Sequence, residues 1–192
     1  MRHGLFMVAL VCVSGCAPVL RGPLDSAAPE AAAATLDHGY TLLYQVLHDE
    51  SSVTLLFGIK HAPKSIETLV RRIGDAAANG EAAIRSTASR YPPIRWDASG
   101  LPLIEVSARH HIANQQAAGL LLAGDSFELR LLLAQQKACD YISALAMTLA
   151  TADSNAERSA MLTTLAHEFA AFEFELRGYL QVRQSSSSNQ GS

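Results

Sequence analysis

The sequence predicts an all-α protein, an antiparallel up-and-down bundle of four helices, on three observations. Alanine is abundant and β-branched residues are sparse in the 192-residue chain, which favours helix over strand. No stretch sustains an apolar–polar alternation, whereas apolar residues recur at steps of three and four over long segments. The connections between these segments are short, and helices joined by short connections pack as antiparallel neighbours.

The first two helices are predicted on either side of Pro63. Apolar side chains follow three- and four-residue steps through residues 35–61, and Pro63 then prevents the helix from continuing. The second helix follows directly, with an apolar stripe that reaches residue 88. A loop is predicted for residues 90–102, which contain prolines, an aspartate and a glycine. In this loop Trp96 either caps the end of the bundle or forms a patch for protein contact.

The third helical region, residues 102–152, is long for a single helix. Gly119 and Gly124 interrupt its apolar pattern, and Asp125–Ser126 offers a cap for a new helix. The region is therefore either one helix with a kink near Gly119–Gly124 or two successive helices.

The fourth helix begins after a turn and is predicted to end at about Arg183. Either Ser154 or Asn155 supplies its N-cap, since both side chains can accept a hydrogen bond from the first turn. The bundle is thus expected to comprise residues 35–183. Residues 184–192 are polar and of low complexity, and we expect them to be disordered.

Four charged residues are predicted to form a buried polar network inside this bundle: Glu50, Arg109, Glu128 and Glu173. At 100° per residue, Glu50 and Glu173 fall near the middle of apolar arcs, Arg109 lies within one, and Glu128 borders one. An arginine satisfies carboxylates with two hydrogen bonds, so Arg109 is expected to reach Glu50 or Glu173. The alternative is a helix break at residues 49–52 that leaves Glu50 in water.

No cofactor, metal or catalytic residue is predicted. Ferritin-like bundles hold metal with Glu-x-x-His pairs, and no glutamate here precedes a histidine at that spacing. Adjacent His110 and His111 point about 100° apart on a helix, so both cannot easily bind one ion. A Gly-x-Ser-x-Gly elbow and a glycine-rich phosphate loop are also missing. The alternative function is a ferritin-like bundle that binds a metal or a small apolar ligand through inward-facing carboxylates.

The N-terminus resembles the signal of a bacterial lipoprotein. A positive start precedes ten apolar residues, 4–13, a run too short to span a bilayer and typical of a secretory signal. The sequence Val-Ser-Gly-Cys follows at 13–16 and resembles a lipobox. The resemblance implies that residues 1–15 are a signal peptide and that Cys16 receives a diacylglyceryl group. Residues 16–34, rich in proline and small residues, are predicted to be the lipidated cysteine and a flexible tether.

Location and partners follow from the same resemblance and from the charge of the chain. In Gram-negative lipoproteins an aspartate after the lipidated cysteine tends to retain the protein at the inner membrane. Ala17 stands there, which implies the outer membrane, facing the periplasm. The net charge is −3 and no Lys/Arg-rich run occurs, so a nucleic-acid partner is not expected. The sequence predicts a lipid-anchored envelope protein with a non-enzymatic structural or protein-interaction role and an unidentified protein partner.

Overall fold

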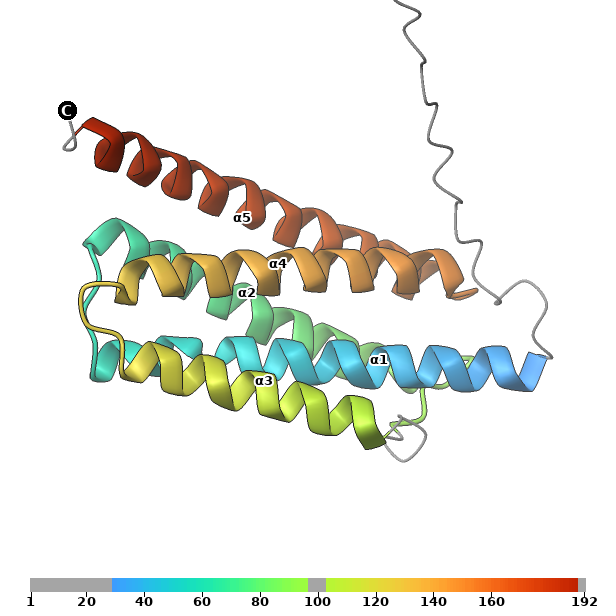
Figure 1. Ribbon diagram of the computed structural model, residues 1–192. Coiled ribbons are helices and arrows are strands. Elements are labelled where there is room, and N and C mark those ends of the chain that lie inside the picture. Colours follow the sequence, from blue (N-terminus) through green and yellow to red (C-terminus); the bar gives the residue numbers. More distant parts are fainter. Residues whose placement is uncertain (1–28, 97–102, 190–192) are drawn as a thin grey trace, which may run out of the picture.

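The computed structural model of the chain describes residues 29–96 and 103–189, and every regular element in these ranges is helical (Figure 1). The elements are α1 (Pro29–Ser51), the 3-10 helix η2 (Val53–Gly58), α2 (Lys64–Thr87), α3 (Leu103–Leu121), α4 (Phe127–Ala152) and α5 (Ala156–Asn189). The all-helical class predicted from composition and periodicity is confirmed. The predicted signal peptide and Cys16 lie outside the described residues.

The outer ends of α1 and α5 lie beyond the predicted limits of the bundle. α1 begins at Pro29, inside the segment predicted as tether, and α5 reaches Asn189, inside the predicted tail. Proline is favourable in the first helical turn because the N–H that it lacks would have no partner there. The alanines at 31–34 that follow are strong helix formers.

α1 ends at Ser51 instead of continuing to residue 61. The hydroxyl of Ser51 donates a hydrogen bond to the His48 carbonyl at 2.7 Å, and that of Ser52 reaches the same carbonyl at 3.4 Å. Such local bonds offer the backbone an alternative to the α-helical ladder. The chain continues as the tighter 3-10 helix η2, which turns Phe57 into the core.

The third predicted region forms two helices, α3 and α4. Gly124 O accepts a hydrogen bond from Phe127 N at 3.0 Å in the connection between them. Ser126 occupies the N-cap position of α4, but its hydroxyl accepts from Arg130 Nε at 3.1 Å and makes no capping bond to the backbone. Ala123 and Phe127 are buried, so this connection is fixed by packing.

The hydrophobic core lies between α1, α2, α4 and α5. α1 packs against α2 and α4, and α5 packs along α4 and against α2. α3 packs against α4. The largest fully buried apolar side chains come from all four core helices: Tyr40, Leu43, Leu47, Leu69, Ile73, Ile84, Leu131, Leu132, Ile142, Leu162 and Phe169. Among the described residues, no helix combines the length and the hydropathy needed to cross a membrane.

Candidate functional site

Glu50 lies in the last turn of α1 and faces the core. It is 6% exposed, whereas its neighbours His48 and Asp49 are exposed. Its Oε1 atom is buried without a hydrogen-bond partner. Burial raises the pKa of Glu50 to about 7, the Gln135 amide opposes this rise, and the charge of Asp49 adds to it. The carboxyl group of Glu50 is therefore protonated in a large fraction of molecules at neutral pH.

Two residues of α4 form the surroundings of Glu50. Gln135 is 2% exposed, and its Oε1 atom is also buried without a hydrogen-bond partner. Cys139 is fully buried, one helical turn further along. Burial raises the pKa of the Cys139 thiol well above its ordinary value, and the carboxylates of Glu50 and Glu173 raise it further. Cys139 is thus a small core residue in a site that disfavours the thiolate.

The other two glutamates of the predicted network have partners of their own. Glu173 accepts from Arg177 Nη2 at 2.5 Å and from Gln136 Nε2 at 3.0 Å. The hydrogen bond from Arg177 is the main reason why the pKa of Glu173 is lowered. Glu128 pairs with Arg183 Nη2 at 3.0 Å.

The structure therefore places Glu50, Glu128 and Glu173 in three different settings. Glu50 is buried without a cationic partner among the described side chains, and the other two lie near the surface in separate ion pairs. Arg109 belongs to α3, but its side chain lies outside the described part of the structure, so its predicted pairing stays a prediction. No group of three His, Cys, Asp or Glu residues suited to hold a metal occurs in ranges 29–96 and 103–189.

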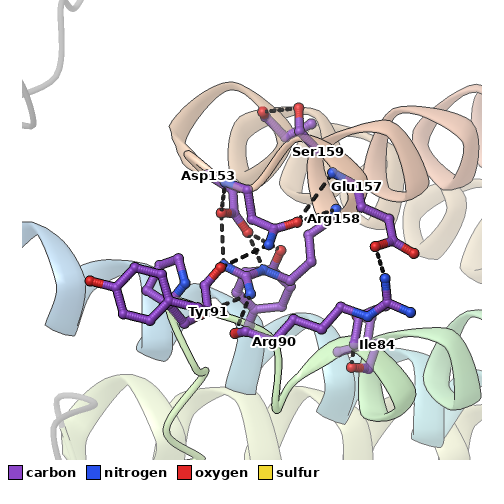
Figure 2. Close-up of polar contacts among 12 residues, drawn as sticks. Ile84, Arg90, Tyr91, Asp153, Glu157, Arg158 and Ser159 are labelled. Carbon is purple, nitrogen blue, oxygen red and sulfur yellow. Dashed lines mark hydrogen bonds and ion pairs between the residues drawn. The ribbon is translucent and has the colours of Figure 1, made fainter.

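Sequence reasoning missed the most deeply buried polar cluster, which is centred on Arg158 near the start of α5 (Figure 2). Arg158 is 0% exposed and donates to Asp153 through Nε, at 2.6 Å, and through Nη2, at 2.9 Å. Its Nη1 donates to the carbonyls of Arg90 and Pro92 at 3.0 and 2.8 Å. The Tyr40 hydroxyl donates to Asp153 Oδ2 at 2.6 Å. The cluster thereby joins α1, the segment after α2 and the α4–α5 turn.

Asn155 completes this corner and caps α5. Its Oδ1 accepts from the backbone N–H groups of Glu157 and Arg158 at 3.1 and 3.0 Å, which selects it over Ser154 as the N-cap. Its Nδ2 donates to Tyr91 O at 2.9 Å (Figure 2). The signal available in the sequence was an Asp and an Arg five residues apart across a capped turn, but their burial depends on distant segments.

The charges of the Arg158 cluster are balanced within it. Burial alone would raise the pKa of Asp153, but hydrogen bonds from Arg158, Tyr40 and the Asn155 backbone outweigh burial and lower the pKa. Burial, followed by the bond to Asp153, raises the pKa of Tyr40. Because these groups are buried and satisfied, the cluster is suited to hold the chain together and not to bind a ligand.

Trp96 lies against the outer side of α1. Its ring centroid is 5.3 Å from that of Tyr44, and it is 44% exposed. The Tyr44 hydroxyl donates to Glu81 Oε1 at 2.9 Å, and Glu81 also pairs with Arg85 and His48. This surface cluster satisfies its own polar groups.

α3 is the most exposed helix of the described structure. Every residue from 111 to 118 is exposed, including Ile112 at 53%, and Ile104 near the start of the helix is 85% exposed. Leu120 is buried and anchors the end of the helix. Most helical stability in proteins comes from packing of an apolar face, so a long helix that leaves apolar residues in water has room for a partner.

A groove of about 350 Å³ lies between α3 and α4. Its lining includes Ile112, Gln116 and Leu120 of α3 and Arg130, Leu133 and Lys137 of α4. The three α4 residues share one face because they are spaced by three and four positions. Neither Arg130 nor Lys137 forms an ion pair within the described part of the chain.

A second groove, of about 460 Å³, lies between the starts of α2 and α4 and residues 175–183 of α5. Its charged side chains are paired: Glu128 with Arg183, and Glu175 with Arg72. The groove between α3 and α4 differs because its cations have no acidic partner among the described residues.

Comparison of the chain with family models, with curated proteins and with solved structures found no match in any of the three.

Proposed function

We propose that this chain is a lipid-anchored protein of the bacterial cell envelope with a non-enzymatic, protein-binding role. The order of a positive start, an apolar run and Val-Ser-Gly-Cys supports an anchor at Cys16. Several acyl chains hold a protein stably on a membrane, where a single chain binds only marginally. Ala17 directs the mature protein to the outer membrane, on its periplasmic side.

The proposed scaffold is a bundle of α1, α2, α4 and α5 in which packed neighbours are antiparallel, with α3 on its outside as the crossover from α2 to α4. The helix contacts support this arrangement because each of the four helices packs against two others in a closed ring. The opposite directions of consecutive helices in Figure 1 support it as well. In this scheme α3 returns the chain to the end of the bundle at which α4 begins.

The observation that carries the protein-binding role is the exposure of α3. A scaffold whose core comes mainly from α1, α2, α4 and α5 leaves the exposed part of α3 and its groove available for contact. Ile112 of α3 and Leu133 of α4 both line the groove, and they are 53% and 40% exposed. Apolar side chains gathered at a concave surface are typical of helix-binding grooves.

Photocrosslinking in living cells tests this role. Benzoylphenylalanine replaces Ile112, and a control variant carries it at Phe174 of α5, which is 76% exposed. We expect a crosslinked product of defined mass from position 112 and none of that mass from position 174. The same products from both positions, or none from position 112, would reject α3 as the contact helix.

The anchor is tested by metabolic labelling with palmitate. Cys16→Ser abolishes the label, and Ala17→Asp moves the labelled protein from the outer to the inner membrane fraction. Labelling that persists in Cys16→Ser contradicts the lipoprotein assignment.

The alternative, a ferritin-like bundle with bound metal, is tested by elemental analysis of the purified protein. Stoichiometric iron, manganese or zinc that is lost on Glu50→Ala or Glu173→Ala would replace the protein-binding proposal.

A further inference from the structure

We infer that the groove between α3 and α4 binds an acidic amphipathic helix of the partner protein, an inference that rests on the proposed role of α3 as a contact helix. The groove combines two cations, an apolar floor and side-chain amides. These three features define what can fill it.

The two cations set the charge of the ligand. Arg130 and Lys137 are both exposed and stand two turns apart on α4, about 10 Å along the helix axis. The only polar contact that the structure gives Arg130 there is from its Nε to Ser126 Oγ, which leaves its terminal nitrogens free of ion pairs among the described residues. The chain has a net charge of −3, so this cationic groove stands out from the average surface. Carboxylates at matching positions complement it.

The apolar floor sets the shape of the ligand. Leu133 lies between the two cations on the same face of α4, and Ile112 lines the groove from α3. A helical ligand presents apolar side chains at steps of three, four and seven residues, which can pack on this floor. Acidic residues two turns apart beside them would then meet Arg130 and Lys137. The amides of Gln115 and Gln116, which also line the groove, can bond to polar groups at its edge.

Two other occupants fit less well. In a symmetric dimer through this groove, each copy would bring the same cationic surface to the contact, so the cations of one copy would approach those of the other and repel. A bilayer surface carries suitable negative charge, but it is flat on this scale and leaves the groove between two helices unfilled.

Peptide binding to the full mature chain in phosphatidylcholine nanodiscs tests the inference. The probe is a fluorescent 18-residue amphipathic helix with leucine anchors flanked by glutamates, and its matched control carries lysines in place of the glutamates. We expect roughly tenfold tighter binding of the acidic peptide at low salt, and a smaller difference at high salt because salt screens exposed charges.

Charge reversal locates the site. Lys137→Glu is expected to weaken the acidic peptide by roughly threefold to fivefold, as for exposed ion pairs. Arg95→Glu makes the same charge change on an exposed arginine outside the groove and is expected to leave affinity unchanged.

Equal affinity for the two peptides, or equal effects of the two reversals, would overturn the inference. The inference is also overturned if the acidic peptide does not bind and the protein instead binds phosphatidylglycerol vesicles, or forms a dimer, in a way that Lys137→Glu abolishes. If position 112 crosslinks and any of these results is found, the acidic helix is refuted as the ligand but the contact role of α3 stands. A missing crosslink refutes the proposed function.

Discussion

Arg158 donates two hydrogen bonds to Asp153 across the turn between α4 and α5, and neither side chain is exposed to solvent. The same guanidinium holds two carbonyls of the segment after α2, and Tyr40 of α1 donates to the same carboxylate. A buried ion pair is stable only when its remaining hydrogen-bonding groups are satisfied, as they are here. This corner of the molecule therefore depends on both charges being present.

Replacing Arg158 with methionine tests this dependence. Arg158→Met leaves the buried carboxylate of Asp153 without its counter-charge, and such losses reduce the free energy of unfolding by about 3–5 kcal/mol. Urea denaturation followed by circular dichroism measures the change. The control is Arg177→Met, because Arg177 is exposed in its pair with Glu173 and its loss is expected to change stability far less than the loss of Arg158. Similar effects of the two substitutions would contradict the assigned role of Arg158.

Glu50 gives the protein a predictable dependence of stability on pH. Its pKa is about 7 in the folded state, against an ordinary value of 4.5, so between these values the folded state holds a proton that the unfolded state has lost. The contribution of Glu50 to the free energy of unfolding is therefore fully present below about pH 4.5 and is lost as the pH rises through 7. The total loss is roughly 3 kcal/mol.

Glu50→Gln removes this dependence because the amide is neutral at every pH. We expect the variant to unfold at higher urea concentration than the parent at pH 8 and to differ little from it at pH 5. Glu168→Gln, on the exposed side of α5, serves as the control and leaves the pH profile of the parent intact. If the stability of the parent protein does not fall between pH 5 and pH 8, burial does not raise the pKa of Glu50 and this prediction is wrong.

Cys139 is expected to be inert in the folded protein. It is fully buried and its thiol pKa is raised, so neither access nor the thiolate favours reaction. In a chain with Cys12→Ser and Cys16→Ser, titration with Ellman's reagent should detect one thiol only after denaturation. Adding Ser65→Cys, at an exposed position, provides a thiol that reacts at once. Rapid reaction of Cys139 in native buffer would contradict its burial.

Two glycines in helices are expected to respond oppositely to the same substitution. A Cβ atom at Gly178 would meet nothing within 4 Å, so Gly178→Ala should raise stability by about 0.5–1 kcal/mol through helix propensity. A Cβ atom at Gly80 would lie 2.8 Å from Leu165 Cδ1 and 3.3 Å from Leu47 Cδ1. Gly80→Ala should therefore lower stability by about 1 kcal/mol through crowding between α2, α5 and α1. Thermal unfolding compares the two, and equal shifts would refute the close approach at Gly80.

The two polar clusters differ in how far periodicity could find them. Helical spacing places Glu50 on an apolar arc, and the structure buries it there. The leading prediction carried the first helix to residue 61, whereas α1 ends at Ser51, inside the alternative break at residues 49–52, and Glu50 is buried all the same. The spacing carried no information on the two serine hydroxyls that bond to the His48 carbonyl there. Arg158 was missed for a different reason: an arginine in the first turn of a helix is ordinarily exposed, and its burial requires carbonyls more than sixty positions away in the sequence.

The sequence by itself determined the helical class and the position of most helices, because these depend on local propensity and on the periodicity of neighbouring residues. Tertiary structure alone decided that Asp153, Arg158 and Tyr40 meet, that Glu50 lacks a cationic partner among the described side chains, and that residues 111–118 of α3 are exposed. These outcomes follow from how distant helices pack, and a single helix does not specify which of its polar residues will find a distant partner.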